Sequence, residues 1–358
     1  MDLKEISLLV DKFQIEGNFI SITPYGEGHI NRTFLIETSS NKYILQKIND
    51  SVFPNVDDLM DNIKKVTAFI SSKGKETIKL VPTKDGGWFY KTNDCFYRVY
   101  EFACNTITYQ KPVNLELVKS QGEAFGDLHL LLNDFPANEI KEVIPNFHNT
   151  RQRYHNFINA VEHANNEKLE IAKEEIAFIK EHEKDYSVIV DEIAKGNIKT
   201  RVTHNDTKIN NILFDKDTGK YRLIIDLDTI MPGSVLYDIG DAYRGLFSGD
   251  NEDNKDTSLL KVNFDIFKSF IYGYLDKMIN NLTDTEIKLI PFSAYLMTIE
   301  CGMRFLEDYL RGNVYFHVNY EEHNLVRART QIALAKDILK NLDTLNEIVG
   351  GYKYGEKY

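Results

Sequence analysis

The sequence predicts an α+β protein with two lobes: a small N-terminal antiparallel sheet with one helix, followed by a larger and mainly helical C-terminal lobe. Before about residue 104, short runs are rich in β-branched and aromatic residues, which is typical of strands. From about residue 114, apolar residues recur at three- and four-residue steps, which is typical of helices. A chain of 358 residues with 42% hydrophobic content is long enough to bury two cores. We therefore expect an N-terminal lobe over residues 1–103 and a C-terminal lobe over residues 104–358.

The N-terminal lobe is expected to contain four strands and one helix. In residues 56–72, Leu59, Ile63 and Val66 recur at helical spacing, directly after the helix-start residue Asn55. The runs expected to form strands are residues 19–23, 33–37, 42–48 and 95–101.

The C-terminal lobe is expected to be helical except for one hairpin. The hairpin joins two short apolar runs, residues 201–214 and 221–228, through a polar turn at residues 215–219 that ends in glycine. The expected helices are residues 115–132, a segment from 157 onward, 171–195, 264–278, 287–310 and 325–348. Polar residues at both ends of the hairpin make it the candidate site of chemistry.

Composition and charge argue against several classes of protein. The formal net charge is −11 and the acidic residues are spread along the chain, so we expect no nucleic acid partner. Three cysteines without C-x-x-C spacing predict neither a disulfide framework nor a thiolate metal site, and they favour the cytoplasm. A basic stretch followed by an apolar run is absent from the N-terminus, and no stretch approaches the roughly 18 apolar residues of a membrane span. We therefore expect a protein that is neither exported nor membrane-bound.

Residues 204–211 place a carboxylate five residues before an amide, with a lysine between them. In phosphoryl transfer, the protein must orient the acceptor hydroxyl and hold the metal ion that bridges the nucleotide phosphates. Asp206 suits the first task and Asn211 the second. Lys208 either contacts the γ-phosphate or pairs with a neighbouring carboxylate, and His204 is expected to brace the loop.

Two further aspartates follow the second run of the hairpin. Asp226 comes after three apolar residues, at a strand end where a carboxylate is held firmly enough to bind Mg²⁺. Asp228 lies on the same side of the strand, two residues on. Taken singly, aspartates and asparagines in turns more often cap helices or satisfy backbone groups. The combination of H-x-D-x4-N, I-D-x-D and P-G-x4-D-I-G-D within residues 204–241 is improbable by chance.

This combination resembles the catalytic region of the aminoglycoside phosphotransferase and choline kinase superfamily, whose members are related to protein kinases. The resemblance implies a protein-kinase-like bilobal fold, with ATP and Mg²⁺ as cofactors and a small molecule as acceptor. It makes Asp206 the catalytic base, and Asn211 and Asp226 ligands of Mg²⁺.

Further runs, which cover essentially the whole chain, resemble the N-acetylhexosamine 1-kinases within that superfamily. This closer resemblance implies ATP-dependent phosphorylation of the anomeric hydroxyl of N-acetylglucosamine or N-acetylgalactosamine. It also implies that Arg304 and Tyr315 contact the sugar and that Asp228 binds sugar or metal. The runs are residues 24–31, 43–46, 203–208, 225–233, 300–306 and 322–327.

For two of these residues the sequence leaves an alternative open. Arg304 lies in an otherwise apolar helix, where an unpaired guanidinium is unfavourable. A salt bridge to Glu300 or Asp308, at four-residue spacing, therefore fits as well as sugar binding. Tyr315, with the aromatic residues that follow it up to Tyr320, either forms a stacking wall for a sugar ring or belongs to the core.

The nucleotide is expected to bind to the N-terminal lobe. Gly26 and Gly28 lie between two predicted strands, and alone they would predict only an ordinary turn. Together with the downstream aspartates, they predict a loop that covers phosphates, with backbone amides, Asn31 and Arg32 beside them.

Gln46 stands where many relatives carry a lysine or arginine, and the adjacent Lys47 points to the opposite face of the strand. Either Gln46 makes a neutral contact while another cation meets the phosphates, or a bulge turns Lys47 inward. The expected helix 56–72 offers no evident partner for a lysine–glutamate pair. The resemblance places the lobe junction, where adenine would bind, at Glu101 and Phe102.

Other functions compete with a sugar kinase. A kinase for homoserine, choline or an aminoglycoside would use the same phosphoryl-transfer residues, although choline calls for an aromatic cage and an aminoglycoside for an acidic surface. A catalytically silent nucleotide-binding protein would not need Asp206, Asn211 and Asp226. His129 is expected to be structural and no zinc site is predicted, while the oligomeric state is not indicated.

Overall fold

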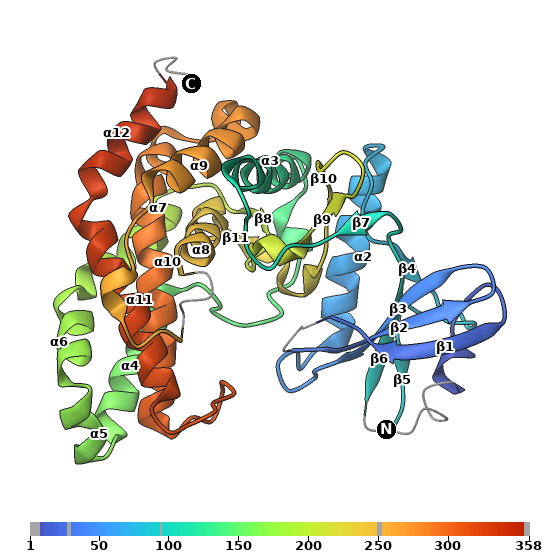
Figure 1. Ribbon diagram of the computed structural model, residues 1–358, viewed down its shortest axis with the longest axis horizontal. Coiled ribbons are helices and arrows are strands. Elements are labelled where there is room, and N and C mark those ends of the chain that lie inside the picture. Colours follow the sequence, from blue (N-terminus) through green and yellow to red (C-terminus); the bar gives the residue numbers. More distant parts are fainter. Residues whose placement is uncertain (1–7, 27–29, 94, 249–252, 354–358) are drawn as a thin grey trace. The chain divides into compact units, whose positions relative to one another are not determined.

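The computed structural model describes residues 8–26, 30–93, 95–248 and 253–353 (Figure 1). The chain forms two compact units. The first consists of Met1–Ile107, Asn138–Pro145 and Leu213–Met231, and the second of Thr108–Ala137, Asn146–Ile212 and Pro232–Tyr358. An N-terminal antiparallel sheet with a helix, followed by a mainly helical part, confirms the predicted α+β class. The division of the chain at residue 103 stays a prediction.

The first unit is built on an antiparallel sheet in the order β1-β2-β3-β6-β4, with β5 paired to β6. All four expected strands are present, with each end within one residue of the prediction. Sequence patterns did not predict β4 and β5, which are two residues long. The strands are β1 (Phe19–Pro24), β2 (Arg32–Thr38), β3 (Lys42–Ile48), β4 (Leu80–Val81), β5 (Tyr90–Lys91) and β6 (Phe96–Glu101).

The pairing of β3 with both of its neighbours runs without a shift in register. Gln46 therefore lies directly opposite Arg98 of β6. Because successive side chains of a strand point to opposite faces, Lys47 stays on the other face from Gln46. The hypothesis that a bulge turns Lys47 inward is wrong.

Helix α2 (Val56–Ser72) has the predicted bounds. The side chain of Asn55 caps it by accepting the backbone N–H of Asp58, which satisfies one of the unpaired donors at a helix start. Leu59, Ile63 and Val66 are fully buried, as their spacing predicts.

The predicted hairpin is formed by β9 (Ile212–Asp215) and β10 (Tyr221–Ile224), and β7 (Thr106–Ile107) pairs with β9. The expected run 201–214 is not one strand, however. Strand β8 (Arg201–Thr203) ends before residue 204 and pairs with β11 (Met231–Gly233), so the residues between β8 and β9 form a loop.

The second unit is mainly helical, as predicted, but its helices are interrupted more often. The expected helix 171–195 is broken by a 3-10 turn at Glu183–Ser187, and the expected helix 325–348 breaks at Asn341. The segment Val235–Ser248 was not predicted to be helical but forms α8. The helices are α3 (Leu115–Leu131), α4 (Thr150–His163), α5 (Asn166–Ile171), α6 (Lys173–Glu181), α7 (Val188–Ala194), α8, α9 (Phe264–Met278), α10 (Asp284–Arg311), α11 (His323–Lys340) and α12 (Leu342–Lys353).

Helices α3 and α9 cross in close contact because both carry glycine at the crossing. A Cβ atom on Gly122 would lie 2.1 Å from the carbonyl oxygen of Phe270, and one on Gly273 would lie 2.3 Å from that of Lys119. Any larger residue at either position would push the two helices apart.

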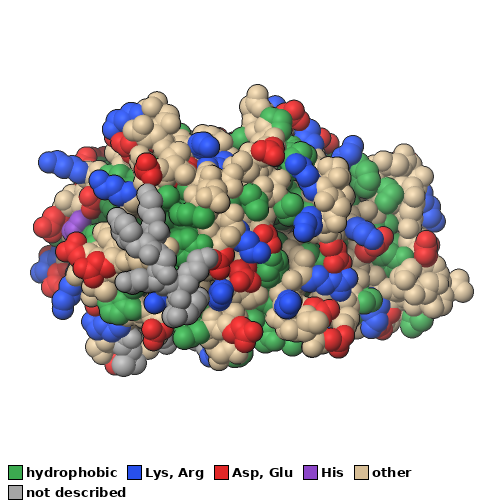
Figure 2. Space-filling view, turned by 90° about the horizontal axis from the view of Figure 1, so that it is seen from above, with side chains coloured by type: hydrophobic (Ala, Val, Ile, Leu, Met, Phe, Trp, Pro, Cys, Tyr) green, Lys and Arg blue, Asp and Glu red, His purple; other side chains and the backbone are tan. Residues whose placement is uncertain are grey.

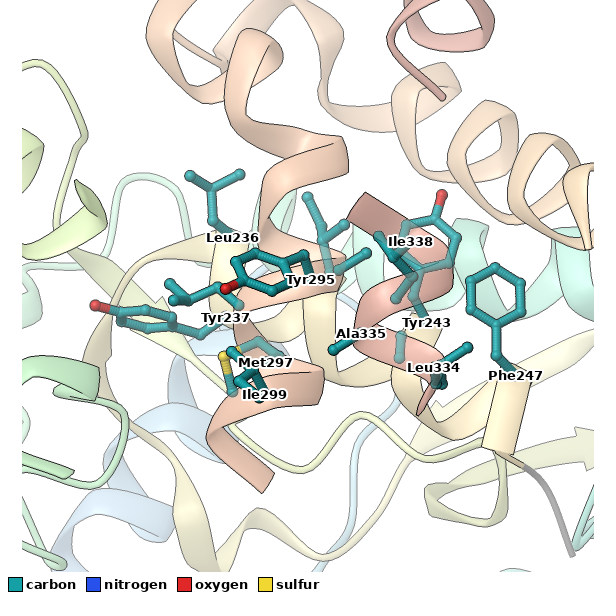
Figure 3. Close-up of a cluster of buried hydrophobic side chains, with 14 of the residues drawn as sticks. Leu236, Tyr237, Tyr243, Phe247, Tyr295, Met297, Ile299, Leu334, Ala335 and Ile338 are labelled. Carbon is teal, nitrogen blue, oxygen red and sulfur yellow. The ribbon is translucent and has the colours of Figure 1, made fainter. Parts of the chain in front are cut away.

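Side chains of α8, α10 and α11 pack together in the core of the second unit (Figure 3), which also includes residues of α4, α9 and α12. Tyr243 of α8, Tyr295 of α10 and Ile338 of α11 are fully buried there. Helix α10 is thus packed against neighbours along much of its length, which fixes the polar residues near its C-terminal end.

Lys and Arg side chains alternate with Asp and Glu on the described part of the face in Figure 2, without a broad field of one sign. Cys95, Cys104 and Cys301 are not in disulfide bonds. None of the helices within the described ranges is long and apolar enough to cross a membrane.

Candidate active site

The loop between β8 and β9 brings three of the predicted catalytic residues together in the second unit. The side-chain nitrogen of Asn211 donates to the backbone carbonyl of Asp206 at 2.9 Å and to its carboxylate at 3.0 Å. The ammonium of Lys208 lies 3.1 Å from the other carboxylate oxygen of Asp206. A 3-10 turn at Ile209–Asn211 makes this approach possible within so short a segment.

Lys208 is therefore paired with a carboxylate, which was one of its two predicted roles. The Asp206 carboxylate raises the pKa of Lys208 and Asp241 adds to this effect, while burial opposes it. The lysine stays a cation, and half of its side chain is exposed. It can therefore also meet an anionic phosphate.

Buried groups brace the loop from behind. Asp238 of α8 accepts the backbone N–H groups of His204 and Asn205, both at 2.7 Å. His129 of α3 lies 2.7 Å from the same carboxylate and 2.8 Å from the hydroxyl of Tyr274, which supports its predicted structural role. Asn205 adopts a left-handed backbone conformation (φ 65°), which such bracing stabilises.

The second aspartate of the P-G-x4-D-I-G-D motif, Asp241, accepts the backbone N–H of Thr207 at 3.0 Å. Burial opposes the ionisation of Asp241, but Arg244 and Lys208 outweigh this effect and lower its pKa. The motif thus supplies two carboxylates that accept backbone N–H groups on both sides of Asp206.

The candidate metal-binding segment follows β10 in the first unit. Asp226 itself has a left-handed backbone (φ 58°, ψ 58°), and a 3-10 turn at Leu227–Thr229 comes next. Asp228 is buried, with Arg98 at 2.6 Å and the side-chain nitrogen of Asn31 also at 2.6 Å. These contacts connect Asp228 to β6 and to the residue before β2. Its role as a sugar or metal ligand stays a prediction.

The donor chemistry of Asp226 and Asn211 suits Mg²⁺. The side-chain nitrogen of Asn211 is used by Asp206, which leaves the amide oxygen as the atom for a metal. Carboxylate and amide oxygens are hard ligands, and Mg²⁺ is usually held by one or two such groups together with phosphates and water. Within the described ranges, no group of three or more His, Cys, Asp and Glu residues could hold a metal ion. Asp226 and Asn211 would therefore bind Mg²⁺ together with phosphate and water oxygens rather than enclose it with protein ligands alone.

Both polar atoms of the Gln46 side chain are hydrogen-bonded within the sheet. Its side-chain oxygen accepts hydrogen bonds from Arg98 at 3.0 and 2.8 Å, and its nitrogen donates to Thr33 at 3.2 Å. Arg98 was not among the predicted site residues. Its signal in the sequence is that it stands among the apolar and aromatic residues of β6, which ends in Glu101.

The predicted nucleotide loop is described in part. Gly26 has a positive φ (76°), which glycine adopts without strain, and Arg32 is exposed at the start of β2. Asn31 connects this loop to Asp228. Gly28 lies outside the described residues.

At the expected lobe junction, backbone donors are already engaged. Glu101 donates its N–H to Lys79 and Phe102 donates its N–H to Lys42. The ring of Phe102 makes an edge contact with Tyr25, at 5.9 Å between ring centroids. Adenine contacts at Glu101 and Phe102 would thus involve groups other than these two N–H donors, and they stay a prediction.

Helix α10 reaches the catalytic loop through a buried chain of hydrogen bonds. Glu300 accepts from His148 at 2.8 Å and from the hydroxyl of Thr150. The other ring nitrogen of His148 lies 3.4 Å from the carbonyl oxygen of Asn205, next to Asp206. Burial opposes the ionisation of Glu300, but His148 together with Thr150 and Arg153 outweighs burial and lowers the pKa of Glu300.

Neither predicted salt-bridge partner of Arg304 is available to it. Glu300 is used by His148 and Thr150, and Asp308 accepts the backbone N–H groups of residues 314, 315 and 316. We find no ion pair of Arg304 within the ranges that the structure describes. The salt-bridge interpretation of Arg304 is therefore wrong.

Arg304 instead lies between two aromatic rings. Its guanidinium is 5.4 Å from the ring centroid of Phe147 and 5.6 Å from that of Phe316. Arg153 donates twice to the backbone carbonyl of Phe147, so a second guanidinium lies close by. Burial lowers the pKa of Arg153, and the charge of Arg304 lowers it further. We call this group the arginine–aromatic cluster: Phe147, Arg153, Arg304 and Phe316.

Tyr315 is 60% exposed and contacts the ring of Phe316 edge-on at 4.8 Å. The interpretation of Tyr315 as a core residue is therefore wrong. Phe316 is partly buried against the main core, so of these two rings only Phe316 belongs to it.

The sequence matches the phosphotransferase enzyme family (APH) over residues 21–260. Three solved structures share the fold over nearly the full length of both chains. A microcompartment-associated aminopropanol kinase is 13% identical with a TM-score of 0.62, covering 96% of this chain and 99% of its own. A spectinomycin phosphotransferase in complex with ADP and spectinomycin is 14% identical with a TM-score of 0.57, covering 99% of both chains. A choline kinase from Cryptosporidium parvum is 15% identical with a TM-score of 0.59, covering 98% and 100%.

Proposed function

Because this chain belongs to the phosphotransferase enzyme family, we propose that it uses ATP to phosphorylate the anomeric hydroxyl of an N-acetylhexosamine. Phosphoryl transfer to a hydroxyl acceptor follows from the family. The sugar, the use of Mg²⁺, the residue roles and a cytoplasmic location are the parts that we add.

In the proposed reaction, Asp206 accepts the proton of the acceptor hydroxyl and orients its oxygen. Asn211 keeps the Asp206 carboxylate in place, and Lys208 meets the charge of the transferred phosphoryl group. Bound Mg-ATP would supply the phosphoryl group, with Asn211 and Asp226 each offering an oxygen to the metal.

The observation that carries the acceptor assignment is the arginine–aromatic cluster. Arg304 follows Glu300 by about one helical turn, and Glu300 is linked through His148 to Asn205 of the catalytic loop. We infer that an acceptor bound beside Asp206 extends to the two guanidinium groups of this cluster. Like charges repel more strongly away from bulk water, so the cluster disfavours a cationic acceptor.

Choline, ethanolamine, aminopropanol and aminoglycosides carry such a cation, whereas an N-acetylhexosamine is neutral. Arginine donors can bind sugar hydroxyl and N-acetyl oxygens, and the exposed Tyr315 ring offers a surface for the pyranose. The resemblance to N-acetylhexosamine 1-kinases supports the particular sugar and the anomeric position. Homoserine stays a rival, because its carboxylate could pair with Arg304.

The test is a panel of acceptors with ATP and Mg²⁺, with ADP release as the readout. The panel comprises N-acetylglucosamine, N-acetylgalactosamine, glucosamine, homoserine, choline, ethanolamine and spectinomycin. We expect turnover with the two N-acetylhexosamines and much less with glucosamine, whose amine is cationic. Phosphorus NMR of the product should then show an anomeric phosphate.

Turnover confined to choline, ethanolamine or spectinomycin would refute the assignment of a neutral acceptor. Turnover with homoserine alone would show that the acceptor carries a carboxylate. ADP binding without turnover on any acceptor would favour the catalytically silent protein. Glucose serves as the matched neutral control for the N-acetyl group, because it differs from N-acetylglucosamine only at carbon 2.

A further inference from the structure

The sheet of the first unit carries its buried cation on β6 rather than on β3. Arg98 is 1% exposed, and its guanidinium lies 2.6 Å from the Asp228 carboxylate. The same guanidinium donates twice to the side-chain oxygen of Gln46. A buried guanidinium without partners is strongly unfavourable, so these three side chains depend on one another.

Asp228 also helps to anchor the segment after β10, as does Ile230. Asn31 donates to the Asp228 carboxylate at 2.6 Å. Two residues further on, the backbone carbonyl of Ile230 accepts from Asn62 of α2 at 3.2 Å. Asn62 is fully buried and in addition bonds to the backbone of Lys141.

The anchoring matters because Asp226 has an unfavourable backbone. Left-handed φ and ψ values on a residue other than glycine persist only where the surrounding structure enforces them. On the C-terminal side of Asp226, the chain is held at Asp228 and at Ile230, and Arg98 is the charged partner of Asp228.

We propose that Arg98 is a positioning residue for the nucleotide's Mg²⁺: through Asp228 it fixes the backbone at Asp226 so that Asp226 can bind the metal. In protein kinases, a lysine on the third strand paired with a glutamate on the adjacent helix must be in place for activity. Here Gln46 occupies the strand position and serves as an acceptor for Arg98 instead. The proposal rests on phosphoryl transfer with Asp226 as a magnesium ligand, and it is independent of the acceptor.

The burial of Arg98 decides between positioning and direct contact. Its guanidinium is enclosed by Gln46, Asp228 and the sulfur of Met60, at 3.9 Å. A side chain enclosed in this way cannot reach a phosphate without leaving those partners. Its influence on the nucleotide must therefore pass through Asp228 and the metal.

The test is the binding of ADP to the full chain by calorimetry, at a series of Mg²⁺ concentrations and without metal. Arg98→Met should raise the Mg²⁺ concentration for half-maximal enhancement of ADP binding by about tenfold or more. Metal-free ADP binding should stay unchanged. Lys65→Met is the matched control, because Lys65 is a cation of α2 that forms a partly exposed pair with Asp61 and should alter neither quantity.

A rescue variant distinguishes the loss of a positioned charge from general damage to the fold. The double variant Q46K/R98M returns a cation to β3, within reach of Asp228, and should recover part of the Mg²⁺ dependence that Arg98→Met loses. Arg98→Lys serves where Arg98→Met does not fold. It keeps the charge but loses the forked geometry that bonds Gln46 and Asp228 together, and should raise the Mg²⁺ requirement by less.

Three outcomes would overturn the proposal. An unchanged Mg²⁺ requirement in both Arg98→Met and Arg98→Lys would make Arg98 merely structural. Equal weakening of ADP binding with and without metal would make it a direct phosphate contact. An unchanged Mg²⁺ requirement in Asp226→Ala would remove the premise. Because the titration contains no acceptor, a failure of the sugar assignment would show only in the acceptor panel.

Discussion

Two arginines of this protein lie in opposite surroundings. Arg98 of the first unit is buried and paired with Asp228 and Gln46. Arg304 of the second unit is partly exposed and lies between the rings of Phe147 and Phe316.

The electrostatic environments differ in the same way. Burial alone would lower the pKa of Arg98, but Asp228, Tyr100 and Asp226 together outweigh burial and raise the pKa. Beside Arg304, in contrast, burial and the second positive charge lower the pKa of Arg153. A guanidinium whose donors are used within the protein can only position other groups. A guanidinium that lies between aromatic rings and beside another cation, as that of Arg304 does, is stabilised most by a polar ligand. This contrast distinguishes the two roles that we propose.

The largest effect on stability is expected from Arg98→Met. This change leaves the Asp228 carboxylate buried without its cation, and breaking a buried ion pair in this way costs about 3–5 kcal/mol. Arg304→Met should stay within about 1 kcal/mol of the wild type, since it breaks no ion pair. Urea unfolding of both variants measures the difference.

A double-mutant cycle sharpens this prediction. Arg98→Met combined with Asp228→Asn removes both charges, so it should destabilise the protein less than Arg98→Met alone. Additive losses in the cycle would contradict an energetic coupling between Arg98 and Asp228.

Asp206→Asn should strongly reduce turnover while leaving the contacts of Arg98 and Arg304 unchanged. Removal of a general base typically lowers turnover by about 10²–10⁴-fold. ADP affinity and the midpoint of urea unfolding should stay near the wild-type values, because asparagine can keep the contact with Asn211. Steady-state kinetics with the best acceptor of the panel gives the answer, and near-normal turnover would show that Asp206 is not the base.

The fold was largely predictable because its strands and longest helices follow simple periods. Helix α2 and helix α9 have the predicted bounds, since apolar residues at helical spacing meet a start signal at Asn55 and at Asn263. Helix α8 was not predicted because the P-G-x4-D-I-G-D motif runs from β11 into its first two turns, so glycine and aspartate interrupt the apolar period there.

The site was predictable only where its residues are neighbours in the sequence. Asp206, Lys208 and Asn211 lie within one loop, so their spacing indicated their contact. The contact between His148 and Glu300 spans 152 residues, and no local period points to it. The same limit hid Arg98, whose partner Asp228 belongs to a different part of the chain.

Arg304→Met tests the other arm of the comparison between the two arginines. If Arg304 binds the acceptor, its loss should raise the acceptor KM by about 10–100-fold, equivalent to losing a charged hydrogen bond of about 1.5–3 kcal/mol. The KM for ATP should not change. Arg304→Lys should recover little, because an ammonium cannot reproduce the planar contact with two rings. An equal rise in both KM values would indicate damage to the unit rather than lost binding.

The smallest effect is expected from Glu300→Gln, which leaves a hydrogen-bonding group in place of a carboxylate. Interaction with His148 lowers the pKa of Glu300 in the folded protein below its ordinary value of 4.5. A carboxyl with a depressed folded pKa stabilises the protein above its unfolded pKa, and that contribution is lost as the pH falls through the folded value. The melting temperature of the wild type should therefore exceed that of Glu300→Gln near neutral pH, and the gap should close in acid. A gap that stays constant down to pH values well below 4.5 would show that the ionised Glu300 does not hold His148 against the catalytic loop.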